Sequence, residues 1–209
     1  LGLLLRHCSH RGSSLEYGII REHGISCCYH GWHYGNDGTI LIAGAEPENS
    51  HIPADIVHGA YPTHEYNGII FAYMGPPDEL PEFPMYDTYD LPDTQSAAFS
   101  LSAPCNWLQV YENHQDPIHT VFLHSRGNDV HFGQAWAEVQ VLEFFDTPIG
   151  MSNVQTRRWG DLVWCRTVEG MLPNGNQTGA VWEQADEEKF FRRVGFTRWM
   201  VPVDDTHTI

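Results

Sequence analysis

Basic residues are scarce in this chain of 209 residues, which holds 11 Lys and Arg against 27 Asp and Glu. The formal net charge is −16 at pH 7, and neutralising phosphate groups requires clustered Lys and Arg. We therefore expect neither nucleic acid nor an anionic membrane surface as a partner. No apolar run approaches the roughly twenty residues that span a bilayer, and no segment resembles a signal peptide. The five cysteines show no regular pairing, which is typical of the reducing cytoplasm.

Histidine is plentiful, with 13 copies, and this justifies a search for metal ligands. The first candidate group lies near the start, where the letters C-S-H at 8–10 are followed, sixteen residues later, by C-C-Y-H at 27–30. In a Rieske-type [2Fe-2S] centre, two cysteines hold one iron and two histidines hold the other. The spacing therefore predicts that each loop gives one ligand to each iron. The predicted ligands are Cys8, His10, Cys27 and His30.

Two other interpretations of these four residues stay open. A structural zinc ion is often bound by two cysteines and two histidines, although zinc fingers usually pair like with like along the chain. A disulfide would leave both histidines without a role and would leave one of the five cysteines unpaired. The neighbouring residues favour the cluster, because Gly12 and Gly31 let the loops turn tightly and Trp32 can exclude water. We expect Cys28 to be a packed thiol and not a ligand.

Pattern and composition divide the chain into three parts. Residues 1–75 have the short apolar runs and turn signals of an all-β domain, with a hairpin expected at Asn67-Gly68. Residues 76–98 are rich in proline and acidic residues, and we expect an extended linker there. Residues 99–209 begin with a helical pattern and continue with strands, including a hairpin at Gly160-Asp161. The expected fold class is α+β, with a helix beside a mostly antiparallel sheet in the last part.

The start of the chain is unusual for a free terminus. Leu1 to Leu5 form an apolar run that leads directly into the first candidate metal loop, and there is no initiating methionine. We therefore expect the chain to be a fragment that is cut within its first domain.

A second group of candidate ligands lies on the helical pattern over 104–124. His119 and His124 are five residues apart, which places them about 140° apart around a regular α-helix. A π-type widening near Pro117 would bring the two together, and such bulges often lie at functional sites. Two histidines and a carboxylate, with open positions, form the facial set that binds non-haem Fe(II). The alternative interpretation is two unrelated histidines near the end of a helix.

Both motifs, in this order and with a proline-rich stretch between them, resemble those of the Rieske non-haem iron (aromatic ring-hydroxylating) oxygenases. The letters R-H-C-S-H-R-G and C-C-Y-H-G-W resemble the Rieske box of their large subunits. The pattern E-N-x-x-D-P-x-H-x-x-x-x-H, from residue 112, resembles their mononuclear iron motif. The resemblance covers essentially the whole chain and is strongest to the phthalate-dioxygenase-like branch. It implies a Rieske [2Fe-2S] domain truncated at its N-terminus and a catalytic domain truncated at its C-terminus.

The resemblance also implies roles for individual residues. The two cysteines of the loops would bind one cluster iron and the two histidines the other, while His119 and His124 would bind the mononuclear iron. The third iron ligand of the family is an aspartate beyond the last residue of this chain, and we assign neither Asp204 nor Asp205 to that role. Asp116 would be an electron-transfer bridge, bonded to His119 and to the cluster histidine His30 of a neighbouring subunit in a homotrimer. An N-cap role for Asp116, before the proline that follows it, is the alternative and is compatible with the bridge.

The function implied by the resemblance is that of a terminal oxygenase component, a mono- or dioxygenase. It would use O2 and electrons from NAD(P)H, delivered by a separate reductase, to hydroxylate or O-demethylate a small aromatic compound. One alternative is a Rieske ferredoxin-type electron carrier, which needs only residues 1–75. Another is a zinc-stabilised binding module. The histidines outside the two motifs, His58 among them, are expected to be surface or hydrogen-bonded residues.

Overall fold

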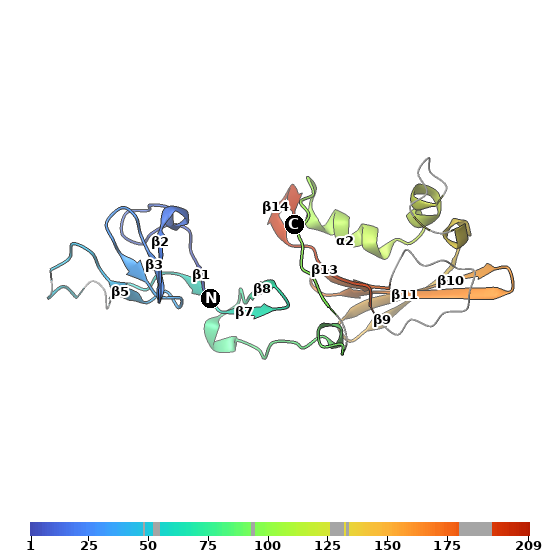
Figure 1. Cartoon of the computed structure of the whole chain (residues 1–209), viewed down its shortest axis with the longest axis horizontal. Coiled ribbons are helices and arrows are strands. Elements are labelled where there is room, and N and C mark those ends of the chain that lie inside the picture. Colours follow the sequence, from blue (N-terminus) through green and yellow to red (C-terminus); the bar gives the residue numbers. More distant parts are fainter. Residues whose placement is uncertain (48, 52–54, 93–94, 126–131, 133, 180–193) are drawn as a thin grey trace. The chain divides into compact units, whose positions relative to one another are not determined.

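The computed structural model describes residues 1–47, 49–51, 55–92, 95–125, 132, 134–179 and 194–209. The chain forms two compact units, Leu1–Ala98 and Phe99–Ile209 (Figure 1). The finer division predicted from the sequence, with a linker over 76–98, stays a prediction.

The first unit is built almost entirely of short antiparallel strands. Its main sheet has the order β2-β3-β4-β5, and two further pairs join β1 to β6 and β7 to β8. The strands are β1 Leu3–Leu4, β2 Ile19–Arg21, β3 Gly24–Ser26, β4 His33–Tyr34, β5 Ile40–Ile42, β6 Ala60–Tyr61, β7 Thr63–Tyr66 and β8 Ile69–Ala72. Short 3-10 turns cover Leu15–Tyr17, Pro77–Glu79 and Asp87–Tyr89. The hairpin predicted at Asn67-Gly68 is confirmed, and positive φ values of 50° and 78° at its two central residues explain why these residue types are needed there.

The core of the first unit contains the two cysteines that were predicted to bind metal. Its buried members are Cys8, Leu15, Cys27, Trp32, Tyr34 and Ile40. The two candidate metal loops are therefore anchored in the core by their cysteines and are not attached to the surface of the sheet.

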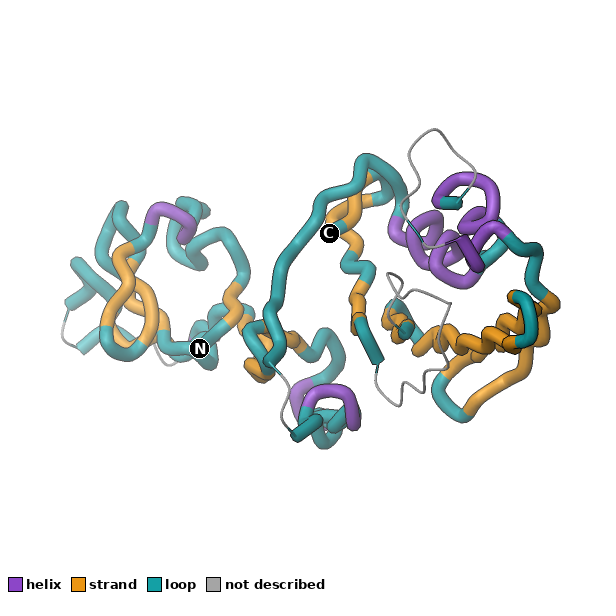
Figure 2. The backbone as a smooth tube through the Cα atoms, turned by 45° about the vertical axis from the view of Figure 1, so that its right-hand side comes forward, coloured by secondary structure: helices purple, strands orange, loops and turns teal. Residues whose placement is uncertain are grey.

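The second unit consists of a five-stranded antiparallel sheet and a helix, as predicted. The sheet order is β13-β12-β11-β10-β9, and a small pair joins β14 to β15. The strands are β9 Val141–Thr147, β10 Gly150–Trp159, β11 Leu162–Met171, β12 Gly175–Thr178, β13 Phe196–Trp199, β14 Pro202–Asp204 and β15 His207–Thr208. The hairpin predicted at Gly160-Asp161 joins β10 to β11, and α2 lies along one face of the sheet in both backbone views (Figures 1 and 2). None of the helices in the described part of the chain is long and apolar enough to cross a membrane.

The helical segment is shorter than its sequence pattern and is broken in the middle. Helix α2 covers Trp107–Gln115 and is capped by the side chain of Asn106, which accepts the Leu108 N–H at 3.0 Å. It ends before Asp116-Pro117, because a residue that precedes proline disfavours the helical conformation. The chain then forms a π-helical turn over Thr120–His124 and a 3-10 turn over Gln134–Ala137. The widened turn that the spacing of His119 and His124 requires is thus present. It follows a break in the helix at Asp116-Pro117, where we had expected only a bend.

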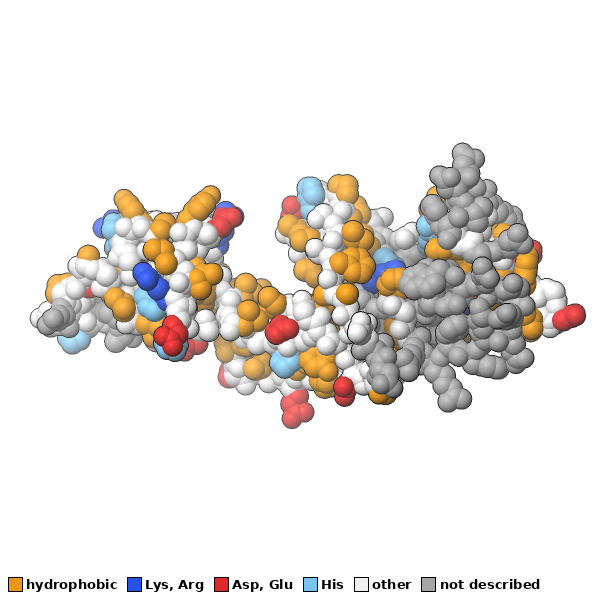
Figure 3. All heavy atoms as spheres, viewed as in Figure 1, with side chains coloured by type: hydrophobic (Ala, Val, Ile, Leu, Met, Phe, Trp, Pro, Cys, Tyr) orange, Lys and Arg blue, Asp and Glu red, His pale blue; other side chains and the backbone are white. Residues whose placement is uncertain are grey.

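The scarcity of Lys and Arg in the sequence is also visible on the surface of the protein. Figure 3 shows few basic side chains on the face in view, whereas hydrophobic side chains are spread over both units. Several large apolar residues of the first unit are exposed, among them Tyr17, Ile20 and Tyr29.

We predict that Gly24→Ala destabilises the first unit, because Gly24 turns the β2–β3 hairpin at a φ of +125° and an added Cβ would overlap the main-chain oxygen of Tyr34. The expected loss is about 2–4 kcal/mol in the free energy of unfolding, measured with urea. Gly12→Ala is the control, since Gly12 also has a positive φ but no atom lies within 4 Å of its added Cβ. Equal losses in the two variants would show that the overlap with Tyr34 is unimportant.

Candidate metal centres

The two metal loops of the first unit are closed by the same hydrogen-bond pattern. In the first loop, the Gly12 N–H donates to the Cys8 carbonyl at 2.9 Å; in the second, the Gly31 N–H donates to the Cys27 carbonyl at 3.0 Å. Both glycines have a φ of +73°. The Cys27 N–H also donates to the Trp32 carbonyl at 2.8 Å, which joins the ends of the second loop. Two equivalent loops therefore present one cysteine and one histidine each.

The two histidines of these loops lie against each other. The ring centroids of His10 and His30 are 4.9 Å apart, at an interplanar angle of 67°. Trp32 stacks on His10 at 4.9 Å and 4°, and Tyr29 packs on His30 at 3.8 Å. The Nδ1 atoms of both histidines are buried without a hydrogen-bond partner. Buried polar atoms normally have a partner, so two adjacent imidazole nitrogens in this condition suit metal ligation.

The two cysteines are buried and free, so the disulfide alternative does not describe this structure. The Tyr34 hydroxyl lies 3.0 Å from the Cys8 sulfur, and the thiols of Cys8 and Cys27 are within hydrogen-bonding reach of each other. Burial alone would raise the pKa of the Cys8 thiol, but hydrogen bonds from Tyr34 and the His10 main chain outweigh it, and the pKa is lowered. Burial and the adjacent Cys8 raise the pKa of Tyr34, so its hydroxyl remains a donor. A stabilised thiolate is the form that binds metal.

The four predicted ligands therefore converge as two pairs. Among the described residues, no three His, Cys, Asp or Glu side chains surround one point where a single ion could bind. A [2Fe-2S] cluster needs only two protein ligands on each iron, since sulfide completes the coordination. Paired thiols beside paired imidazole nitrogens fit such a cluster.

A hydrogen-bonded chain supports the first loop from behind. The Ser9 N–H donates to the Tyr34 hydroxyl at 3.2 Å, and the Ser9 side chain lies 2.7 Å from Nδ1 of His58. Nε2 of His58 lies 2.8 Å from the Leu5 carbonyl, which can only accept, so Nε2 carries the proton and Nδ1 accepts from Ser9. His58 is 2% exposed and its ring packs on Tyr34 at 4.4 Å. This supporting role was missed, because nothing local distinguishes His58 from the other histidines.

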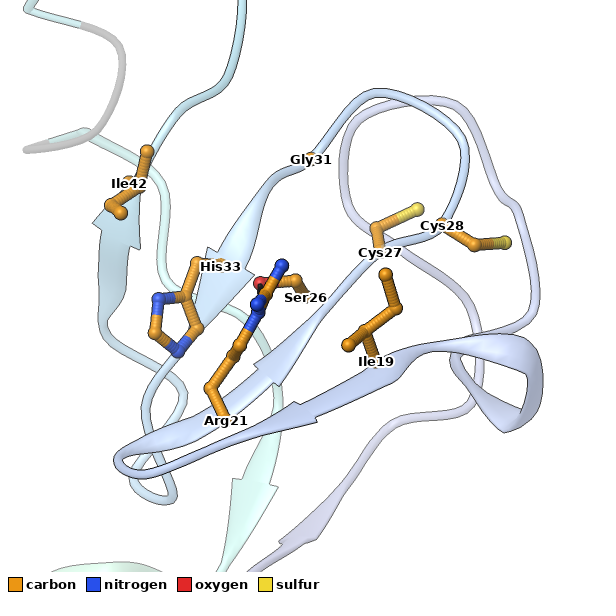
Figure 4. Close-up of a pocket in the computed structure, with 8 residues that line it drawn as sticks. All are labelled: Ile19, Arg21, Ser26, Cys27, Cys28, Gly31, His33 and Ile42. Carbon is orange, nitrogen blue, oxygen red and sulfur yellow. Dashed lines mark hydrogen bonds between the residues drawn. The ribbon is translucent and has the colours of Figure 1, made fainter.

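A hollow of about 470 Å³ opens beside the second loop (Figure 4). Cys27 and Cys28 lie at its loop end, and the Arg21 side chain of β2 donates a hydrogen bond to the Ser26 hydroxyl of β3 at 3.3 Å. Its lining comprises Ile19, Arg21, Ser26, Cys27, Cys28, Gly31, His33 and Ile42. The expectation that Cys28 is packed was wrong, because this thiol is exposed, whereas that of the preceding Cys27 is buried.

The second candidate site lies around the π-helical turn. The ring centroids of His119 and His124 are 5.3 Å apart, so the widened turn brings the two imidazoles to the same side. Nδ1 of His119 lies 2.5 Å from the main-chain oxygen of Asp116 and must donate to it. This bond fixes the tautomer and leaves Nε2 of His119 as the metal-binding atom, as is usual for histidine ligands.

In the predicted bridge the carboxylate of Asp116 would bond His119, but in the structure the main-chain oxygen of Asp116 makes this bond. His119 is bonded to the Asp116 carbonyl, while the Asp116 carboxylate accepts the Ile118 N–H at 2.9 Å. The carboxylate therefore closes a local turn at Pro117, whereas Asp116 itself is the residue that ends α2 and His119 is the residue that precedes the π-helical turn. The Asp116 side chain is otherwise exposed.

Asp204, which we did not assign as an iron ligand, is the last residue of β14, where the chain turns into β15. Its carboxylate accepts the Thr206 N–H at 2.7 Å and the Thr206 hydroxyl at 2.9 Å, and it lies 3.1 Å from Nδ1 of His207. These bonds lower the pKa of Asp204 to about 2. The neighbouring Asp205 accepts a hydrogen bond from the Asn106 side chain at its main-chain oxygen.

An all-strand unit with paired Cys and His loops, followed by a helix-and-sheet unit with a histidine pair, defines a Rieske-type protein with a second candidate iron site. Residues 4–54 match the Rieske [2Fe-2S] domain. The chain is 43% identical over 225 residues to the tert-butanol monooxygenase / tert-amyl alcohol desaturase oxygenase subunit of Aquincola tertiaricarbonis. This alignment covers 100% of this chain and 47% of the relative. It is 33% identical over 226 residues to the phenoxybenzoate dioxygenase subunit alpha of Ectopseudomonas oleovorans, covering 99% of this chain and 53% of the relative.

The fold is also that of a solved oxygenase. A crystal structure of dicamba monooxygenase bound to dicamba superposes with a TM-score of 0.75 at 16% identity, over 99% of this chain and 64% of that one. The chain spans about half the length of the curated relatives it matches. The chain contains a Rieske [2Fe-2S] domain, and over its whole length it is similar to the oxygenase subunits of Rieske-type oxygenases.

We predict that Tyr34→Phe lowers the reduction potential of the cluster. The reduced cluster carries more negative charge on its sulfur ligands, so a hydrogen bond to Cys8 stabilises it more than the oxidised form. A bond worth about 1 kcal/mol corresponds to roughly 40 mV for one electron. The potential is measured by spectroelectrochemical titration. Tyr29→Phe is the control, because Tyr29 is exposed and packs on His30 through its ring; equal potentials in all three proteins would contradict the assignment.

Proposed function

We propose that this protein is the terminal oxygenase component of a multicomponent system. The observation that carries the proposal is the pairing of His119 with His124 on a π-helical turn, in a chain whose first unit is a Rieske domain. A ferredoxin-type carrier would use the first unit alone and would leave this second pair without a purpose. A zinc-binding module would explain neither the histidine pair nor the family.

The geometry supports an assignment of the residues that would hold the cofactors. Cys8 and Cys27 would bind one iron of the [2Fe-2S] cluster, and His10 and His30 would bind the other through their buried Nδ1 atoms. The Fe(II) ligands would be His119, His124 and a carboxylate that we do not assign within these residues. When bound, the cluster supplies single electrons and the iron supplies open positions for activating O2.

The protein's own residues orient these ligands. The Asp116 carbonyl holds the His119 ring with its Nε2 directed away from the main chain. The exposed Asp116 carboxylate would accept a hydrogen bond from a cluster histidine of a neighbouring subunit. This places Asp116 between two imidazoles, through its carbonyl on one side and its carboxylate on the other. Such a bridge requires a closed assembly, for which we propose a homotrimer.

The partners and the substrate class complete the proposal. A separate reductase would deliver electrons from NAD(P)H, and the substrate would be a small aromatic compound that is hydroxylated or O-demethylated. The relatives named above act, by their names, on tertiary alcohols in one case and on phenoxybenzoate in the other. Names therefore leave open whether this protein takes a neutral or an anionic substrate. We place the protein in the cytoplasm because its cysteines are free.

We predict that the full-length protein, which would include the third iron ligand, is coloured and holds three irons per chain, and that His119→Ala removes one iron while the visible spectrum stays unchanged. Iron is measured by mass spectrometry and the cluster by absorption. His114→Ala is the control, because His114 is a neighbouring helix histidine whose Nδ1 bonds the Val110 carbonyl at 2.7 Å. A colourless zinc protein would favour the binding module. Two irons that are indifferent to His119 would favour the carrier.

Asp116→Asn should abolish turnover and leave the cluster spectrum and the iron content unchanged. Asparagine keeps the carbonyl that holds His119 and retains an oxygen to cap Ile118, so the change removes only the negative charge. Turnover is measured as O2 consumed with reductase and NADH. Glu112→Gln, which neutralises an exposed carboxylate of α2, should behave as the wild type. Normal turnover in Asp116→Asn would remove this residue from the proposed bridge.

A further inference from the structure

The two candidate iron ligands of the second unit lie on a turn that ordinary helix geometry would not produce. His119 and His124 are five residues apart, which in an α-helix would place their side chains about 140° apart around the axis. In the structure their ring centroids are 5.3 Å apart, because the turn over Thr120–His124 is π-helical. Turns of this kind are rare, and this one is held by contacts from side chains.

The break before the turn leaves the Pro117 carbonyl without its α-helical donor. In an α-helix this carbonyl would accept the N–H of Val121, four residues further on. That N–H instead donates to the Ile118 carbonyl at 3.1 Å. Pro117 is buried, and a buried carbonyl without a partner is costly. Other donors are therefore needed at this point.

Two buried side chains bond the Pro117 carbonyl. The Thr120 hydroxyl donates to it at 2.6 Å and the Gln140 side-chain amide at 2.8 Å, while the Thr120 N–H lies further away, at 3.2 Å. Thr120 is 7% exposed and Gln140 is 5% exposed. A carbonyl oxygen has two lone pairs, so the two side chains satisfy it completely.

Gln140 makes this bond from a distant part of the chain. It lies 23 residues beyond Pro117 and directly before β9, an outermost strand of the five-stranded sheet. Its Nε2 must face Pro117, because a carbonyl only accepts, and its Oε1 is buried with no partner among the described residues. The bond to Pro117 therefore ties the start of the sheet to the start of the π-helical turn.

A third side chain closes the other end of the turn. The Ser125 hydroxyl donates to the Thr120 carbonyl at 3.0 Å, and Ser125 is 9% exposed. This bond spans five residues, the same interval as the main-chain bonds of a π-helix. It therefore favours the wide turn over an α-helical one, in which a carbonyl bonds the fourth residue after it.

We infer that Thr120, Ser125 and Gln140 are positioning residues of the candidate iron site. Their side chains hold the two nearest carbonyls that flank the Ile118–His119 step, and thereby keep His119 facing His124. We call these three residues the carbonyl clamp. The inference rests on the proposed function, because it concerns residues that orient the ligands of the same iron.

The clamp acts on the main chain, whereas a separate bond fixes the ring of His119. Nδ1 of His119 donates to the Asp116 carbonyl, one residue before the clamped carbonyl of Pro117. Without the clamp the segment would relax toward α-helical bonding, which turns His119 away from His124. Only molecules with the wide turn would then bind the metal, so the apparent affinity would fall by that fraction.

The test measures the binding of Fe²⁺, without oxygen, to full-length protein whose mononuclear site has been emptied with a chelator. Affinity is measured by calorimetry, and visible absorption monitors the cluster. Thr120→Val removes the hydroxyl and keeps the branched shape, so it should weaken Fe²⁺ binding at least about fivefold and leave the visible spectrum unchanged. Combining it with Gln140→Met should weaken binding further, because both side-chain donors to Pro117 are lost.

Thr147→Val is the matched control. It makes the same chemical change at the end of β9, at a hydroxyl that is buried without a hydrogen-bond partner. Thr120→Ser, which keeps the hydroxyl, should bind Fe²⁺ within about twofold of the wild type. A residue with only a general structural role would lower the melting temperature of Thr120→Val and leave the affinity of the folded protein unchanged. That result, or equal affinities in Thr120→Val and Thr147→Val, would overturn the inference.

A second measurement needs no metal and covers the case in which Thr120→Val does not fold. Exchange of main-chain amide hydrogens over 117–125, followed by mass spectrometry, should be faster in Gln140→Met and Ser125→Ala than in Thr147→Val. Unchanged exchange would disprove the clamp even in a protein that binds three irons. Wild-type protein that takes up no third iron would instead disprove the proposed function, and with it the role of the clamp at the iron.

Discussion

The first unit buries two thiols and two imidazole nitrogens close together, and the protein offers the two nitrogens no hydrogen-bond partner. The rest of that unit is arranged around these four atoms. The thiols of Cys8 and Cys27 are core residues, and the Nδ1 atoms of His10 and His30 are buried and unbonded. Each unsatisfied atom of this kind costs on the order of 1–3 kcal/mol. A bound cluster would offset that cost, so loading and folding of this unit should be coupled.

The supporting residues show how the fold maintains this arrangement. Trp32 stacks on His10, and the Tyr34 hydroxyl approaches the Cys8 sulfur. Behind them, His58 and Ser9 fix the Tyr34 hydroxyl through a chain of hydrogen bonds. Trp32 therefore excludes water from the loops, and the hydrogen bond from Tyr34 stabilises negative charge on the Cys8 sulfur.

The sequence could predict those features that depend on residues close together along the chain. The ligand types and their spacing indicated both metal loops, and the five-residue interval between His119 and His124 required a widened turn, which the structure contains. His58 could not be found in this way, because its hydrogen-bond partners lie 49 and 53 residues away along the chain. The buried polar side of β10, with Asn153 and Gln155, could not be predicted for a related reason: alternating polar residues on a strand are typical of a solvent-facing side, and only the packing of α2 shows that this side is interior. The exposure of Cys28 depends likewise on the turn that its loop adopts.

The two units share one physical theme, which is the burial of polar groups that the chain alone does not satisfy. In the first unit these groups are the Nδ1 atoms of two candidate metal ligands, and in the second they are guanidinium nitrogens of Arg157 and Arg166. A bound cluster would satisfy the first group, so that binding site is also a place where the bare fold is least stable. This is the usual relation between function and stability in enzymes.

The central claim is that each iron of the cluster has a different pair of protein ligands, and Mössbauer spectroscopy of ⁵⁷Fe-enriched protein tests it most directly. In the reduced protein we expect two inequivalent irons in equal amounts: a ferric site ligated only by sulfur, and a ferrous site with two nitrogen ligands from His10 and His30. Two irons that both have all-sulfur coordination, or an absence of cluster iron in a folded protein, would contradict the account.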